Sequence, residues 1–189
     1  MASYLQVSNS GLEPITLDEA KLHLRVDSDE EDTLIYALIV TARQAVENYT
    51  WLNLNEAVYN MFFDATEVDE FIRINKQVIT ITSVQYKDAA GVYQTLSPSS
   101  YQTDLYSYPC RIKIDTRPAV GNFLNAWKIV FTAGFTSPEL VPDQIKSAMK
   151  LTIGHLYEHR EDVTMSSNYA LENGAKYLVT PYKLPTYFI

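Results

Sequence analysis

The chain has 189 residues, of which 47% are hydrophobic and 20% are charged, and its net charge at pH 7 is −8. This composition is that of an ordinary globular protein and excludes a largely disordered chain. The excess of acidic side chains argues against binding nucleic acid through its phosphates, which requires clustered Lys and Arg.

The single cysteine, Cys110, excludes an intrachain disulfide, and we expect it to be a small, partly buried apolar residue. The N-terminal Met1–Tyr4 lacks the basic stretch and apolar run of a signal peptide. No apolar run approaches the ~18 residues that a membrane-spanning helix needs. We therefore expect a soluble protein that does not enter a membrane.

Two helices are predicted in the N-terminal part. Thr16 and Glu19 have the spacing of a capping box, which predicts a short helix from about Leu17 to Leu24. In the acidic run that follows, Asp27 or Ser28 is predicted to cap a long helix from about Asp29 to Tyr49. This helix is indicated by apolar residues at spacings of three and four: Leu34, Ile35, Leu38, Ile39, Ala42, Ala45, Val46 and Tyr49. Trp51 and Leu52, just past its end, are expected to cover the core.

From residue 57 to residue 133 the apolar period changes to two, which is typical of strands. The turn at Asp88–Gly91 predicts a hairpin, and an irregularity is expected near Ser83. The predicted strands are Ala57–Phe63, Phe71–Ile74, Val78–Tyr86, Val92–Leu96, Tyr101–Tyr106, Arg111–Ile114 and Trp127–Thr132.

Helix returns after Pro142 and is predicted to end near His159 or Arg160, and a final short helix is predicted at Gly174–Val179. The order helix–strand–helix predicts an α+β fold. We expect a discontinuous helical bundle from residues 1–56 and 134–189, with an antiparallel β sandwich or barrel from residues 57–133 inserted into it.

One motif with catalytic potential is His155-Leu156-Tyr157-Glu158-His159, which matches the inverted zincin pattern H-x-x-E-H. Two histidines four residues apart on a helix could hold Zn²⁺, with Glu158 as general base and Glu161 or Glu172 as a third ligand. A histidine beside the apolar face and near the C-terminus of a helix is also an ordinary structural feature. The structural interpretation is preferred, so no catalytic residue, metal or cofactor is predicted; a zinc-dependent hydrolase is the alternative.

Several stretches in this order resemble the head–tail connector (adaptor) proteins of tailed double-stranded DNA bacteriophages. The stretches are Pro14–Val26, Asp29–Ile35, Glu47–Trp51, Phe131–Phe135, Val141–Ala148, His155–Glu161 and Leu178–Lys183. The resemblance covers nearly the whole chain, and it rests on the order and spacing of the stretches. It also gives a second reason to set the zinc interpretation aside.

The resemblance implies a non-enzymatic virion protein that forms a twelve-fold ring beneath the portal. Such a ring extends the DNA channel, docks the stopper or the tail-completion protein, and recognises no specific nucleic-acid sequence. Another neck or tail subunit is a further alternative. By this resemblance, Thr186, Tyr187, Phe188 and Ile189 are the expected portal contact. Acidic residues expected to line the channel and repel DNA are Asp27, Asp29, Glu30, Glu31, Asp32, Glu67, Asp69 and Glu70.

Overall fold

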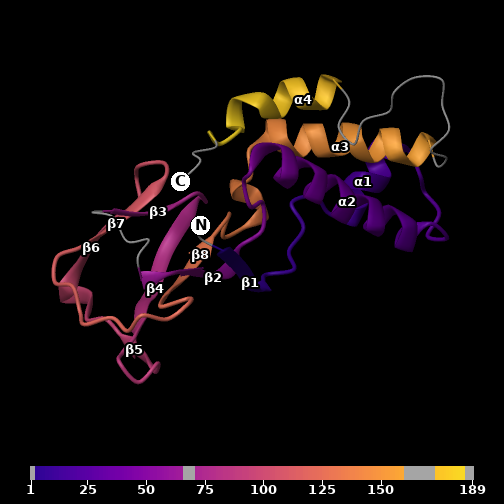
Figure 1. Cartoon of the computed structure of the whole chain (residues 1–189). Coiled ribbons are helices and arrows are strands. Elements are labelled where there is room, and N and C mark those ends of the chain that lie inside the picture. The colour runs from indigo at the N-terminus through magenta and orange to yellow at the C-terminus, as the bar shows by residue number, and fades with distance from the viewer. Residues whose placement is uncertain (1–2, 66–70, 160–172, 186–189) are drawn as a thin grey trace. The chain divides into compact units, whose positions relative to one another are not determined.

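The computed structural model describes residues 3–65, 71–159 and 173–185 (Figure 1). The chain divides into two compact units. The β unit comprises residues 3–10 and 56–134 and the helical unit comprises residues 11–55 and 135–185, each as far as the structure describes them. The fold is α+β, with helices in one unit and antiparallel sheets in the other.

The helical unit is built from α1 (Leu17–Leu24), α2 (Asp32–Thr50), α3 (Asp143–Glu158) and α4 (Asn173–Val179) (Figure 1). Short 3-10 turns, Pro138–Leu140 and Thr180–Tyr182, precede α3 and follow α4. The predicted apolar stripe of α2 supplies four fully buried side chains to the core, Ile35, Ile39, Ala42 and Val46. They pack with one face of α3, where Ile145, Ala148, Met149 and Ile153 are also fully buried.

The two predicted starts of the N-terminal helices have different outcomes. The capping box of α1 is confirmed, because the Thr16 hydroxyl accepts from the Glu19 amide and the Glu19 carboxylate accepts from the Thr16 amide. The predicted cap of α2 is wrong: the helix begins at Asp32, after Glu31, and no side chain caps it. Ser28 instead accepts from the Glu30 amide in the preceding turn.

The β unit contains two antiparallel sheets, and its strands follow the predicted segments closely (Figure 1). The five-stranded sheet has the order β1-β2-β8-β4-β5 and the three-stranded sheet has the order β3-β7-β6. Their bounds are β1 Ser3–Asn9, β2 Ala57–Phe63, β3 Phe71–Ile74, β4 Val78–Lys87, β5 Tyr93–Thr95, β6 Tyr101–Asp104, β7 Cys110–Ile114 and β8 Trp127–Ala133. The expected irregularity at Ser83 is confirmed, since the register of β4 against β8 shifts between Ile81 and Ser83.

Inward side chains of both sheets form one core. Phe131 of β8 is fully buried and stacks on Tyr59 of β2, with ring centroids 5.6 Å apart, while Trp127 stacks on Phe63. Ile74 and Ile112, from the three-stranded sheet, belong to the same cluster. Large aromatic side chains therefore fill much of this core, where each buries a large apolar area.

Two expectations are corrected. Ser3–Asn9 is a strand paired with β2, although the prediction placed residues 1–56 with the helices. Nearly every residue of β1 is exposed, including Leu5 and Val7, so the short apolar alternation of this segment does not mark a buried face. Trp51 does not cover the core: it adopts a left-handed conformation at the end of α2, and 53% of its side chain is exposed, whereas Leu52 is buried as expected.

Candidate functional site

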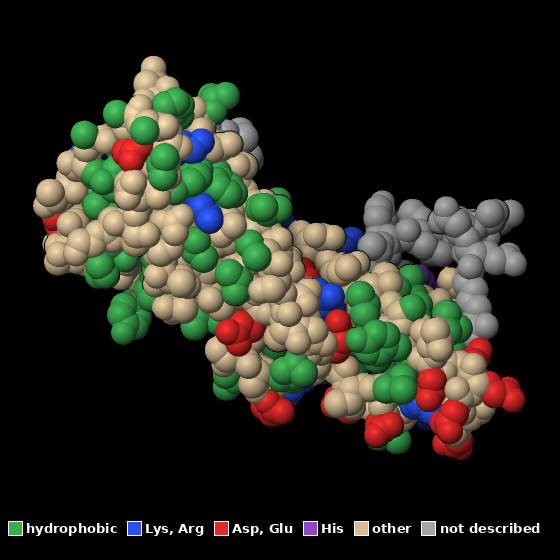
Figure 2. All heavy atoms as spheres, turned by 90° about the horizontal axis from the view of Figure 1, so that it is seen from below, with side chains coloured by type: hydrophobic (Ala, Val, Ile, Leu, Met, Phe, Trp, Pro, Cys, Tyr) green, Lys and Arg blue, Asp and Glu red, His purple; other side chains and the backbone are tan. Residues whose placement is uncertain are grey.

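Acidic side chains gather at one end of the helical unit (Figure 2). Part of this group is held by neighbouring residues. Lys21 of α1 donates to Asp29 at 2.6 Å and to Asp32 at 2.8 Å, and the hydrogen bond from Lys21 lowers the pKa of Asp29. Glu31 accepts a hydrogen bond from the Tyr157 hydroxyl of α3. These carboxylates therefore join α1, α2 and α3 in addition to carrying charge.

The other predicted channel residues differ in their surroundings. Asp27 and Glu30 are exposed, and within the described ranges no salt bridge involves the side chain of either residue. Asp29 is exposed as well, although it pairs with Lys21. Glu67, Asp69 and Glu70 lie outside the described residues.

The His155-x-x-Glu158-His159 motif lies at the C-terminal end of α3. The two imidazole rings stack on each other with centroids 4.6 Å apart, and His159 Nδ1 lies 3.1 Å from the His155 carbonyl oxygen. Glu158 and His159 are exposed. Among the described residues no group of three His, Cys, Asp or Glu side chains could hold a metal ion. The suggested third ligands Glu161 and Glu172 lie outside those residues.

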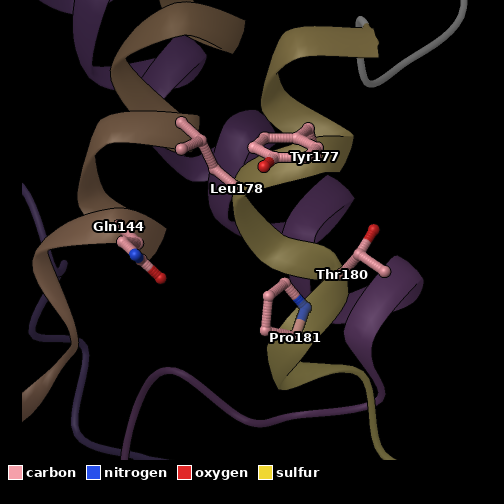
Figure 3. Close-up of a pocket in the computed structure, with 5 residues that line it drawn as sticks. All are labelled: Gln144, Tyr177, Leu178, Thr180 and Pro181. Carbon is pink, nitrogen blue, oxygen red and sulfur yellow. The ribbon is translucent and has the colours of Figure 1, made fainter.

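The predicted portal contact, Thr186, Tyr187, Phe188 and Ile189, also lies outside the described residues. The chain leading to it is anchored, because the Leu184 amide donates to the carbonyl oxygen of Thr50 at the end of α2. A hollow of about 290 Å³ opens nearby between α3 and α4 (Figure 3). Its lining residues are Gln144, Tyr177, Leu178, Thr180 and Pro181.

Sequence reasoning missed a basic surface on the three-stranded sheet of the β unit. Arg73 of β3 and Lys113 and Arg111 of β7 alternate with the buried Ile72, Ile74, Cys110 and Ile112, so their side chains occupy the outward face. Phe71 lies on the same face. The guanidinium carbon of Arg111 lies over the Phe71 ring, 5.6 Å from the ring centroid. The period-two alternation was visible in the sequence, but only the pairing of β3 with β7 brings the three cations together.

Cys110 is fully buried, more than the partial burial expected, and burial raises the pKa of its thiol to about 11. A thiol with that pKa is almost entirely protonated at neutral pH and is a poor nucleophile. No helix within the described ranges is long and apolar enough to cross a membrane.

Comparison with known proteins places this arrangement in a family. The family model of the phage gp6-like head–tail connector proteins matches residues 14–108. No curated protein matches the chain.

Solved structures share the fold. A chain in the neck of an empty gene transfer agent particle, computed with C6 symmetry, superimposes with a TM-score of 0.77. A chain in the virion of the native particle gives the same TM-score, and one in the native neck computed with C12 symmetry gives 0.70. In each case the sequence identity is 20%, and the match covers 98% of this chain and 97% of the other. Because the family model spans half of the sequence, the chain belongs to the phage gp6-like head–tail connector family.

Proposed function

We propose that this head–tail connector acts as one copy of a ring beneath the portal, where it extends the DNA channel and docks the stopper or the tail. The observation that carries the proposal is the family match over residues 14–108. The similar chains occur in the necks of particles computed with C6 and C12 symmetry, which supports a ring of repeated copies, twelve in the virion. The protein would then reside at the head–tail interface after assembly in the host cytoplasm.

In this proposal the helical unit is a bundle and the β unit is a sandwich, which except for β1 is inserted between α2 and α3. The single cluster formed by side chains of both sheets supports a sandwich. The common core of α1, α2, α3 and α4 supports a bundle. Each unit would fold around its own core and present its own surface to the ring.

Negative charge suits a channel through which DNA must slide without binding. The run Asp27, Asp29, Glu30, Glu31 and Asp32 and the group Glu67, Asp69 and Glu70 are our candidates for the channel wall. Within the first run, Lys21 pairs with Asp29 and Asp32, and Tyr157 donates to Glu31.

The C-terminal residues Thr186, Tyr187, Phe188 and Ile189 are proposed to bind the portal. Three of the four are large apolar or aromatic residues, the type that anchors interfaces. The test is a chain truncated after Pro185, assayed for binding to purified portal and for rescue of a connector-deficient phage. We expect an intact fold, weakened portal binding, and heads that package DNA but cannot join tails.

A matched control distinguishes the loss of the apolar side chains from the shortening of the chain. Replacing Tyr187, Phe188 and Ile189 together by Ser should reproduce the truncation, whereas Thr186→Ser should behave as the original protein. If the truncated protein is incorporated normally and gives full yields of infectious particles, the anchoring role is wrong.

The proposed role needs neither a cofactor nor catalysis. The His155/Glu158/His159 motif is proposed to serve only the end of α3, where His159 lies against the His155 carbonyl. We expect no stoichiometric zinc in the purified protein by elemental analysis. Near-equimolar zinc that is lost in the His155→Ala variant would overturn this interpretation and revive the hydrolase alternative.

A further inference from the structure

Charge is divided unequally between the two units. The helical unit contains fifteen acidic and eight basic side chains, a net charge of −7. The β unit contains eight acidic and seven basic side chains, a net charge of −1. Identical copies with a net charge of −8 repel one another in a ring, so a contact between them is favoured where local charges of opposite sign meet.

The outward face of the three-stranded sheet is the place where basic side chains are concentrated on the β unit. The register places Phe71, Lys113 and Gln102 in one row across the three strands, and Arg73, Arg111 and Asp104 in the next. A shallow groove of about 230 Å³ runs over this face. Its lining residues are Phe71, Gln102, Thr103, Asp104, Arg111 and Lys113. The surface therefore combines cations, an aromatic ring and a depression.

Arg73 and Arg111 face each other directly across the β3–β7 pair. Two like charges at opposed positions destabilise a sheet. Arg111 forms an ion pair with Asp104, in which the guanidinium nitrogen and the carboxylate oxygen are 2.5 Å apart. Arg73 makes no ion pair with any residue in the described part of the chain, and Lys113 has only a loose pair with Asp115 at 3.9 Å. Arg73 and Lys113 are therefore the cations of this face that remain for an anionic partner.

We propose that this basic face, defined by Phe71, Arg73, Arg111 and Lys113, binds the acidic end of the helical unit of a second copy of the chain. The inference rests on the proposed ring. The counterpart is the exposed pair Asp27 and Glu30, on the unit that carries almost all of the net negative charge. The contact joins different surfaces of successive copies, which is the kind of interface that closes into a ring.

Charge complementarity favours a second copy over DNA. The face offers three cations, and Asp104 already occupies one of them. Proteins that hold duplex DNA through its backbone neutralise roughly 6–10 phosphates, and this chain as a whole repels DNA. A carboxylate that docks on a neighbouring copy cannot also line the channel. Of the acidic candidates named above, this inference therefore assigns Asp27 and Glu30 to the ring contact and leaves the others to the channel wall.

The head-to-tail geometry allows a mixing experiment with two variants of the full chain. Variant A carries Arg73→Glu and Lys113→Glu, and variant B carries Asp27→Lys and Glu30→Lys. In either variant alone, like charges meet at the contact. In an equimolar mixture, every contact between an A copy and a B copy pairs opposite charges. Self-association is measured by sedimentation velocity over a concentration series, with and without purified portal rings as template.

We expect each variant alone to associate at least ~10-fold more weakly than the original protein, and the mixture to recover association to within ~3-fold. Lys128→Glu, on the other sheet of the β unit, and Asp143→Lys, at the start of α3, are the controls and should associate like the original protein. Circular dichroism should show that variant A is folded, since Arg73→Glu places a carboxylate opposite Arg111.

Three outcomes would overturn the inference. If variants A and B assemble like the original protein, the basic face is not the contact, although the ring proposal survives. If both variants are folded and weakened but the mixture does not recover, the two surfaces do not meet each other. If variant A assembles normally but loses retention of double-stranded DNA in a mobility-shift assay, the face binds DNA. An original protein that forms no ring with or without portal would instead contradict the proposed function itself.

Discussion

The cores of the helical unit and the β unit are built from different kinds of contact. In the helical unit, apolar stripes of α2 and α3 meet, and a charged network lies beside them: Arg43 donates to Glu13 at 2.9 Å and to Glu47 at 2.7 Å. In the β unit, aromatic rings stack across paired strands, as Phe131 does on Tyr59. Among the described residues the two buried clusters share no member.

The difference also extends to the surfaces. The helical unit carries most of the negative charge, and its exposed carboxylates lie both on helices, as Asp18 and Asp143 do, and on the turn before α2, as Asp27 and Glu30 do. The β unit is nearly neutral and displays cations in register on a sheet. In the proposed ring, each copy contacts other copies, a head component and a tail component, and two units with separate cores can present different surfaces to them.

The largest effect is expected from the core of the β unit. Phe131→Ala removes a fully buried ring that stacks on Tyr59, at a cost of about 3–5 kcal/mol. In a Trp51→Phe background, Trp127 fluorescence should show that the β unit unfolds at a much lower denaturant concentration. The circular dichroism signal of the helices should persist at that concentration. Ile39→Ala, in the core of the helical unit, is the matched control: the helical signal should be lost at a lower denaturant concentration while the Trp127 signal persists. Coincident loss of both signals in both variants would show that the units unfold together.

The charged network of the helical unit comes next. Arg43→Met leaves the nearly buried carboxylates of Glu13 and Glu47 without their cation, which should cost about 3 kcal/mol. Glu47 also accepts from the Leu54 amide, so the chain leaving α2 should loosen. Urea denaturation followed by circular dichroism measures the loss. The triple variant Glu13→Gln, Arg43→Met, Glu47→Gln should recover part of the stability; if it is less stable than Arg43→Met alone, the unpaired carboxylates are not the cause.

A smaller effect is expected at the start of α1. Thr16→Ala removes the side chain that accepts from the Glu19 amide and should cost about 1 kcal/mol. Thr16→Ser keeps the acceptor and should cost much less. The loss should appear in the transition of the helical unit and leave Trp127 fluorescence unchanged. An equal loss in both Thr16 variants would contradict a capping role.

The smallest effect is a dependence on pH at the same cap. The hydrogen bond from the Thr16 amide, helped by Lys150, lowers the pKa of Glu19 below 4.5. Because the pKa of Glu19 is lower in the folded state, its carboxylate stabilises the fold. This stabilisation is fully present above the ordinary pKa of the group and is lost as the pH falls through the lowered pKa. Between pH 6 and about pH 3, Glu19→Gln should therefore flatten the fall in thermal stability of the helical unit. An unchanged slope in this variant would show that other carboxylates govern the acid sensitivity.

Local pattern was sufficient to determine most elements of this protein. The capping box at Thr16 and Glu19, the stripe from Ile35 to Val46 and the strand Ala57–Phe63 can each be read from neighbouring residues, because helices and strands impose periods of 3.6 and two on their buried faces. The order of the segments was also sufficient to indicate the connector family, which the family model confirms.

Only the tertiary structure decided which segments meet. The strand Ser3–Asn9 has almost no buried side chains and forms by pairing with β2. β2 itself pairs with β8, some seventy residues later in the chain. The opposition of Arg73 and Arg111 and the network around Arg43 depend on the same kind of distant pairing. Periodicity records which face of an element is buried, but register and partner choice are set by contacts between residues far apart in the sequence, and no local pattern encodes them.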